Sequence, residues 1–233
     1  MAEPGPALNA TPSSGLTSER VRARMVERVR ELGVRDARVL ASMQRVERHR
    51  FVDPALASRA YEDTALPLGY GQTISQPYIV ARCAELAAAA IADPKGARVL
   101  EVGTGCGYSA AVLSEVFGTV FSIERVRALH DLARVNLRAL RVANLRLIFG
   151  DGMLGHASEA PFHAIVCTAA GEDAPAAWID QLAPGGVIVA PLGRGVQTLT
   201  VIAKSMEGAL ARTRHEAVRF VPLLPGTLMV DRR

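Results

Sequence analysis

Glycine occurs at every second position from Gly103 to Gly107, directly after an apolar run that ends in an acid. Residues 99–107 read VLEVGTGCG, and the residues that follow have the apolar spacing of a helix. A glycine turn between a strand and a helix lets the backbone come close to an adenosine-containing cofactor. A dinucleotide-binding fingerprint has its third glycine one position later, where this chain has Tyr108. The spacing therefore favours S-adenosyl-L-methionine over NAD.

Three acids follow three apolar runs that read as strands. Glu101 ends the first run, Glu124 follows residues 119–123, and Asp151 follows residues 145–149. Ligands of open α/β sheets bind at the carboxyl ends of strands, so we expect these acids to converge. Glu101 suits the ammonium group of a methionine moiety, and Asp151 suits the adenine amino group. Glu124 lies about 20 residues past the turn, where an acid meets ribose hydroxyls.

Each feature taken alone is also compatible with a purely structural role. A G-x-G-x-G turn can join a strand to a helix without any ligand, and Asp151-Gly152 is an ordinary turn dipeptide. Three strands that each end in an acid or a glycine turn make a much stronger signal. The combination indicates a cofactor site.

Helical and strand patterns alternate along the chain and end in two adjacent strands. The expected helices cover about 18–32, 36–46, 77–92, 108–116, 127–140 and 175–182, and the expected strands cover 99–102, 119–123, 145–149, 164–168, 187–191, 198–204 and 210–217. We expect residues 61–76 to form a loop and 184–186 a turn. The order predicts an α/β fold, a doubly wound Rossmann-like sheet of about seven strands with N-terminal helices.

The first 18 residues are rich in Ala, Pro, Gly and Ser and lack the pattern of a signal peptide. We expect residues 1–18 to be a disordered extension. Residues 19–233 are expected to form a single domain. Its N-terminal part, 19–76, would hold helices and loops, and its remainder, 77–233, the cofactor-binding sheet and the C-terminal strands.

Composition argues against several classes of function. The net charge is +4, and the arginines between residues 20 and 38 are interleaved with acids, which favours solvated helix faces over a nucleic-acid site. No apolar run is long enough to span a membrane. Three widely spaced cysteines suit a reducing cytoplasm, and the five histidines show no metal-ligand spacing. We therefore expect no metal, no nucleic-acid partner and no membrane partner.

The residues also exclude some classes of methyl acceptor. After the fourth strand the chain reads Thr168-Ala-Ala-Gly-Glu172, without the D/N-P-P-Y type motif of enzymes that methylate adenine N6 or glutamine. No cysteine follows a proline, which disfavours transfer to cytosine C5. Catechol-type acceptors need a metal site, and the sequence shows none.

Residues 66–78 read LPLGYGQTISQPY, and residues 218–223 read VRFVPL. Together with residues 101–107 and 150–152, they make the chain resemble the bacterial type of protein-L-isoaspartate O-methyltransferases from about Val21 to Gly226. Members of this family use S-adenosyl-L-methionine to methylate the free α-carboxyl of isoaspartyl residues in damaged proteins. The methyl ester collapses to a succinimide, which reopens partly to normal aspartate. The resemblance implies a protein-repair enzyme.

The resemblance also assigns site residues. It implies that Ser75 is the catalytic residue, with Thr73 beside it near the cofactor. The implied cofactor-binding positions are Gln72, Thr73, Ile74, Ser75, Glu101, Gly103, Thr104, Gly105, Gly107, Glu124, Asp151 and Gly152. Its implied partners are proteins and peptides that contain isoaspartate, and we expect a cytoplasmic monomer.

This chemistry fits the residues present. The acceptor is an α-carboxyl with an ordinary pKa of about 3.3–3.7, so it is ionised at neutral pH without a histidine base. Ser75 could orient it by donating a hydrogen bond. Ser75 also lies just before Pro77, where serine commonly caps a helix.

Three other hypotheses remain open at this point. The chain could be a methyltransferase of the same fold that acts on another carboxylate or on a small molecule. It could be a non-catalytic module that retains the cofactor pocket, or a nucleic-acid binder that uses the arginine-rich front.

Overall fold

The computed structural model describes residue 15 and residues 18–230 of the chain. Most of the expected N-terminal extension therefore lies outside the described residues. The helices are α1 (Glu19–Glu31), α2 (Ala37–Arg45), α3 (Pro77–Ala89), α4 (Tyr108–Val116), α5 (Arg127–Arg138) and α6 (Ala176–Asp180). The strands are β1 (Leu66–Gly69), β2 (Gln72–Ile74), β3 (Arg98–Val102), β4 (Thr119–Glu124), β5 (Leu145–Phe149), β6 (Phe162–Cys167), β7 (Leu182–Leu192), β8 (Gln197–Lys204) and β9 (Leu210–Val218).

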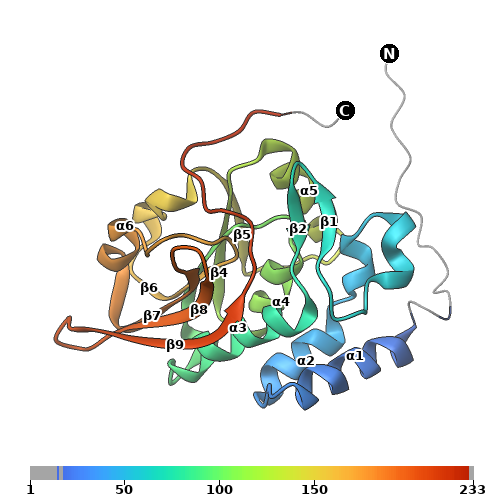
Figure 1. Ribbon diagram of the computed structural model, residues 1–233, viewed down its shortest axis with the longest axis horizontal. Coiled ribbons are helices and arrows are strands. Elements are labelled where there is room, and N and C mark those ends of the chain that lie inside the picture. The colour runs from blue at the N-terminus through green and yellow to red at the C-terminus, as the bar shows by residue number, and fades with distance from the viewer. Residues whose placement is uncertain (1–14, 16–17, 231–233) are drawn as a thin grey trace.

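Seven of these strands form the central sheet, in the order β5-β4-β3-β6-β7-β8-β9. The first five in this order run parallel, and β8 and β9 close one edge as an antiparallel pair (Figure 1). The parallel strands are apolar almost throughout, because helices cover both faces of the sheet. The predicted doubly wound α/β fold is confirmed.

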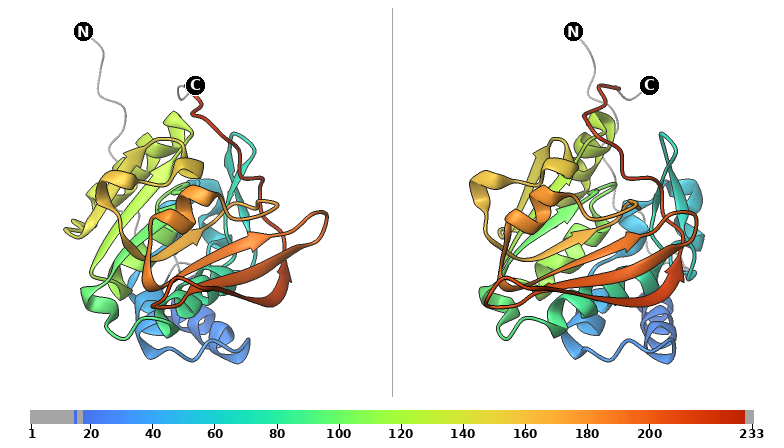
Figure 2. Two further views of the ribbon diagram at one scale, coloured as in Figure 1. Left: turned by 90° about the vertical axis from the view of Figure 1, so that its left-hand side faces the viewer. Right: turned by 60° about the vertical axis from the view of Figure 1, so that its left-hand side comes forward.

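Successive side chains of each strand point to opposite faces of the sheet, so they pack into two separate cores. Val99 and Val120 belong to the core beneath α3, α4 and α5, whereas Leu100 and Phe121 belong to the core beneath α6. The N-terminal helices α1 and α2 pack outside α3 and α4, on the first of these faces (Figures 1 and 2). Trp178 of α6 is fully buried in the second core.

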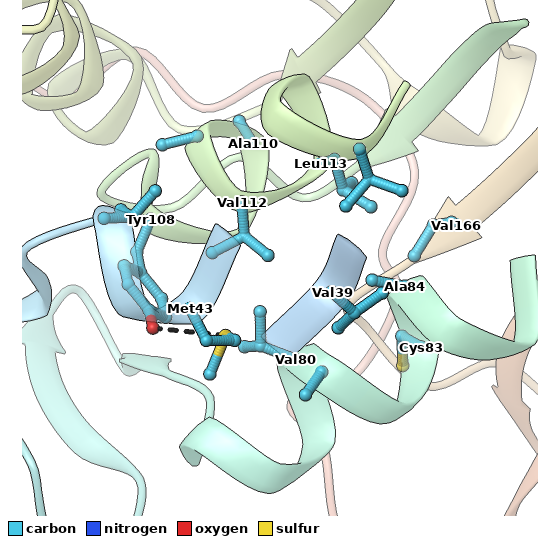
Figure 3. Close-up of a cluster of buried hydrophobic side chains, with 14 of the residues drawn as sticks. Val39, Met43, Val80, Cys83, Ala84, Tyr108, Ala110, Val112, Leu113 and Val166 are labelled. Carbon is cyan, nitrogen blue, oxygen red and sulfur yellow. Dashed lines mark hydrogen bonds between the residues drawn. The ribbon is translucent and has the colours of Figure 1, made fainter. Parts of the chain in front are cut away.

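The contact between α2, α3 and α4 ties the N-terminal part to the sheet (Figure 3). Val39 and Met43 of α2 are fully buried against Val80 of α3 and Val112 of α4. The hydroxyl of Tyr108 donates a hydrogen bond to Met43 Sδ over 3.5 Å. Asp36 caps α2, as predicted, by accepting hydrogen bonds from two backbone N–H groups of its first turn.

Residues 61–76, predicted to be a loop, contain a two-stranded antiparallel hairpin formed by β1 and β2. The connection, residues 69–71, has three consecutive residues with positive φ, including the non-glycine Tyr70 at 53°. Strands of four and three residues, one containing Pro67, are too short for an alternating pattern to be recognised. The prediction of a loop was wrong, because the hairpin follows from the backbone geometry of its turn and not from an alternating hydrophobic pattern.

The predicted turn at 184–186 is also wrong. These residues lie inside β7, where the register shifts from Phe162↔Leu182 to Ala164↔Val187. Three extra residues in β7 oppose β6 at this point, so the glycines form an irregularity within a strand. No helix among residues 18–230 is long and apolar enough to cross a membrane.

We predict that residues 19–230 unfold as one cooperative unit. Met43→Ala should lower the free energy of unfolding by about 2–5 kcal/mol, because it removes a buried side chain from the α2–α4 contact. Urea unfolding monitored by circular dichroism measures this. Leu32→Ala, at a residue that is 49% exposed, is the control and should cost at most about 0.5 kcal/mol. A separate early transition of the N-terminal part would contradict the single domain.

Candidate functional site

A cavity opens where the carboxyl ends of β3, β4 and β6 meet. The chain runs outwards from β3 through β4 to β5 and then returns to place β6 on the other side of β3, so the strand order reverses at β3. Such a switch point is where open α/β sheets bind ligands. The space between its walls, with open solvent included, is about 650 Å³. We call it the glycine-turn cavity, and the predicted residues that line it are Gln72, Thr73, Gly103, Gly105, Glu124 and Gly152.

The glycine turn is fixed between two neighbouring strands. Thr168, which follows β6, donates a hydrogen bond from Oγ1 to the carbonyl oxygen of Gly103 over 2.7 Å. Gly103 has φ of 100°, and a Cβ there would lie 2.3 Å from that hydroxyl oxygen. Only glycine satisfies both the backbone angle and the close approach.

Glu124 anchors the other side of the turn. Its Oε2 accepts a hydrogen bond from the Gly105 N–H, and its Oε1 accepts one from the Val126 N–H, both over 2.8 Å. Burial raises the pKa of this carboxyl, and the two backbone donors oppose that rise. Because each carboxylate oxygen has more than one lone pair, Glu124 can still accept a hydrogen bond from a ligand in the cavity.

Glu101 lies on the opposite face of β3 from this cavity. The next residue, Val102, lines the cavity, and successive side chains of a strand alternate. Glu101 is fully buried. Ser122 Oγ donates a hydrogen bond to its Oε2, while its Oε1 has no hydrogen-bond partner in the described part of the chain. Burial raises the pKa of Glu101 to about 7. The contact of Glu101 with a cofactor ammonium stays a prediction.

The other predicted cofactor-binding residues do not line the cavity, and they contact the segments that form its walls. Thr104 Oγ1 shares a hydrogen bond with Ser122 Oγ, Gly107 is the N-cap of α4 at φ 91°, and Ile74 is buried in the core. Asp151 accepts hydrogen bonds from two backbone N–H groups, those of Met153 and Gly226. Asp151 therefore fixes the C-terminal segment, and its contact with adenine stays a prediction.

Several lining residues were missed in the sequence. Thr168 follows the strand beside β3, a position from which the switch-point rule could have identified it. Leu129 of α5 also lines the cavity, and so does the C-terminal segment Val221–Leu224. That segment is far away in sequence, and only the tertiary fold brings it across the cavity.

A second cavity lies beside the first and contains Ser75. We call it the Ser75 cavity. Thr73, Thr168 and Val221 line both cavities, so the two are adjacent at these side chains. The hairpin of β1 and β2 thus delivers Thr73 to the junction and Ser75 to the second cavity.

Ser75 does not cap the helix. Gln76 is the N-cap of α3, and it makes no side-chain capping bond. Ser75 is half-buried, and no described residue forms a hydrogen bond with its hydroxyl. The hydroxyl is therefore available to a ligand in the Ser75 cavity.

Metal and thiol chemistry find no support in the described residues. Between residues 18 and 230, no group of three or more His, Cys, Asp or Glu side chains could hold a metal ion. Cys106, in the glycine turn, is 2% exposed, and burial raises the pKa of its thiol to about 11. A buried neutral thiol of this kind is unreactive.

The buried Glu101 predicts a pH dependence of stability. A folded pKa of about 7 against an ordinary value of 4.5 means that the unfolded chain binds fewer protons between these values. Stability contributed by the neutral carboxyl is therefore lost as pH rises from about 4.5 to 7, by about 3 kcal/mol at most. Glu101→Gln stays neutral, so its stability relative to the wild type should increase from pH 5 to pH 8.

Thermal unfolding of both proteins across this pH range tests the expectation. Glu31→Gln, at an exposed carboxylate, is the control and should run parallel to the wild type. A constant difference between Glu101→Gln and wild type would show that Glu101 is ionised in the folded protein throughout.

Comparison with known proteins identifies the family to which the chain is similar. The family model described as protein-L-isoaspartate(D-aspartate) O-methyltransferase matches residues 20–227. The protein-L-isoaspartate O-methyltransferase of Methylibium petroleiphilum is 56% identical over 91% of this chain and 80% of its own length. That of Leptothrix cholodnii is 54% identical over 91% of this chain and 76% of its own length.

Solved structures agree. A protein-L-isoaspartate O-methyltransferase superposes with a TM-score of 0.76 at 29% identity, over 86% of this chain and 65% of that longer chain. A Plasmodium falciparum structure, described as a putative enzyme of the same name in complex with S-adenosyl-L-homocysteine, superposes with a TM-score of 0.76 at 23% identity, over 87% of this chain and 98% of that chain. Since the family model covers nearly all the described residues and relatives exceed half identity, this chain belongs to the protein-L-isoaspartate(D-aspartate) O-methyltransferase family.

Proposed function

We propose that this protein transfers a methyl group from S-adenosyl-L-methionine to the free α-carboxyl of L-isoaspartyl residues in damaged proteins. The observation that carries the proposal is the pair of adjacent cavities, one at the glycine turn and one at Ser75. Methyl transfer needs donor and acceptor held in line and shielded from water. Two cavities that share Thr73, Thr168 and Val221 would hold donor and acceptor next to each other, which supports the proposal.

The glycine-turn cavity fits S-adenosyl-L-methionine. Gly103 and Gly105 present backbone without side chains, and the Glu124 carboxylate lies on the wall where ribose hydroxyls can donate to it. Gln72 and Thr73 would close the methionine end, and Gly152 the adenine end. Glu101 and Asp151 would bind the ammonium group and the adenine, as predicted. Thr104, Gly107 and Ile74 would hold the turn and the neighbouring segments in place.

The reaction needs little from the protein beyond orientation. The bound cofactor supplies a methyl group on a sulfonium sulfur, which an oxygen nucleophile displaces in line. The acceptor carboxylate is ionised at neutral pH, so no side chain has to remove a proton. Ser75 donates a hydrogen bond to one carboxylate oxygen and thereby points the other towards the junction of the cavities. The neutral side chains of Thr73 and Thr168 would line the path between the two reactants there.

The expected setting of this activity is the cytoplasm, with isoaspartyl proteins and peptides as partners and the enzyme as a monomer. All three cysteines are free and buried, as suits a reducing compartment. Arg22, Arg30 and Arg38 of the arginine-rich front pair with acids of the same chain. This use of their charge within the fold supports the expectation of no nucleic-acid partner.

Two peptides that differ only in containing isoaspartate or aspartate test the function. With labelled S-adenosyl-L-methionine, we expect label on the isoaspartyl peptide alone, released by mild base as expected for a methyl ester. Cofactor binding should be measured in parallel by calorimetry. Label on neither peptide, with cofactor binding intact, would redirect the search to other carboxylates or small molecules.

Ser75→Ala should lower kcat for the isoaspartyl peptide about tenfold, because one hydrogen bond that orients the nucleophile is lost. The dissociation constant for S-adenosyl-L-homocysteine should stay unchanged. Ser158→Ala, at an exposed serine outside both cavities, is the matched control. Unchanged kinetics for Ser75→Ala would remove the hydroxyl from the mechanism.

A further inference from the structure

Only two charged side chains line the Ser75 cavity among the described residues: Glu216 and Arg219. Both come from the end of β9 and the segment that follows it. The acceptor of the proposed reaction is an anion. How these two charges are held therefore decides what the cavity attracts.

The negative charge of Glu216 is engaged within the protein. A register shift in β9, with Thr198↔Ala217 followed by Thr200↔Arg214, inserts an extra residue next to Glu216. Such a bulge redirects side chains. Here Glu216 Oε1 accepts hydrogen bonds from the Tyr78 hydroxyl over 3.0 Å and from Arg82 Nε over 3.3 Å.

The positive charge of Arg219 is not engaged in this way. Arg219 is exposed, and no residue between 18 and 230 forms an ion pair or side-chain hydrogen bond with it. By contrast, Arg212 of β9 pairs with Asp173 over 2.7 Å. The cavity wall thus holds two charged groups. The Glu216 carboxylate accepts hydrogen bonds from two donors within the protein, whereas the Arg219 guanidinium keeps its five N–H donors free.

We propose that Arg219 binds the carboxylate of the isoaspartyl acceptor and so determines the preference of this enzyme for an anionic substrate. This inference rests on the proposed function and deepens it. Guanidinium is the side chain best suited to bind a carboxylate, through two parallel N–H···O bonds. A free cation at the cavity also attracts an anionic peptide from a distance.

The same contact distinguishes substrate from product. Methyl transfer converts the carboxylate into a neutral ester, so the charge that Arg219 binds disappears in the reaction. Binding therefore favours the unreacted carboxylate, and the ester is released more easily. We therefore expect Arg219 to act on substrate binding and not on the rate of the chemical step.

The test compares two peptides as ligands of the protein saturated with S-adenosyl-L-homocysteine, in which no transfer occurs. One peptide carries isoaspartate, and the other carries the same linkage with its α-carboxyl converted to the neutral amide. The wild type should bind the carboxylate peptide about tenfold more tightly than the amide peptide, the size expected for one charge-assisted contact. Arg219→Gln should remove this difference, and Arg219→Lys should restore part of it.

Arg214→Gln is the matched control. Arg214 is an exposed arginine of β9, five residues before Arg219; it has no ion pair with a described residue, and it lines neither cavity. We expect Arg214→Gln to keep the full difference between the two peptides. In turnover, Arg219→Gln should raise KM about tenfold and leave kcat within twofold, with the affinity for S-adenosyl-L-homocysteine unchanged.

The outcomes separate the two proposals. If the wild type transfers no methyl group to isoaspartyl peptides, the proposed function fails. If the wild type is active but Arg219→Gln retains the wild-type difference between carboxylate and amide peptides, only the role of Arg219 is overturned. A fall in kcat at constant KM would also overturn it, because it would place Arg219 in the chemical step.

Discussion

The close contact between the glycine turn and its two neighbouring strands is the constraint on which the rest of the site depends. Thr168 binds the carbonyl of Gly103 from one side, and Glu124 binds the N–H of Gly105 from the other. A side chain at Gly103 would collide with Thr168. Because the protein itself fixes the turn from both sides, less ordering is needed when a ligand binds, which lowers the cost of binding.

Holding the turn requires polar groups inside an apolar core. Most of these groups form hydrogen bonds with one another. Thr104, Ser122 and Glu101 share hydrogen bonds behind the turn, at the level where Val99 and Val120 fill the core around them. A neutral Glu101 costs far less to bury than an ionised one. The raised pKa of this carboxyl is therefore a consequence of its position, and it couples the turn to pH even though Glu101 does not line the cavity.

Much of the fold could be predicted because it follows from local patterns. Buried parallel strands are apolar runs, and the acid or glycine at the end of each run marks the edge where ligands bind. The hairpin at 66–74 and the irregularity in β7 could not be predicted, since positive φ at Tyr70 and an unpaired stretch at 184–186 leave no periodic signal. Glu101 and Val102 are consecutive in a strand, so the sequence could have shown that their side chains point to opposite faces of the sheet. The crossing of the cavity by Val221–Leu224 depends on tertiary contacts such as Gly226 with Asp151.

The placement of charge explains how one site can hold a cationic donor and an anionic acceptor. The residues shared by the two cavities, Thr73, Thr168 and Val221, are all neutral. The charged side chains each line one cavity only: Glu124 and Arg125 line the glycine-turn cavity, and Glu216 and Arg219 line the Ser75 cavity. Arg125 donates to backbone carbonyls and Glu216 accepts from Tyr78 and Arg82, so both of these charges are engaged within the protein. A charged side chain at the junction would stabilise one reactant in place and raise the barrier for its displacement. With neutral side chains there, no fixed charge at the junction holds the sulfonium or the carboxylate back from the other reactant.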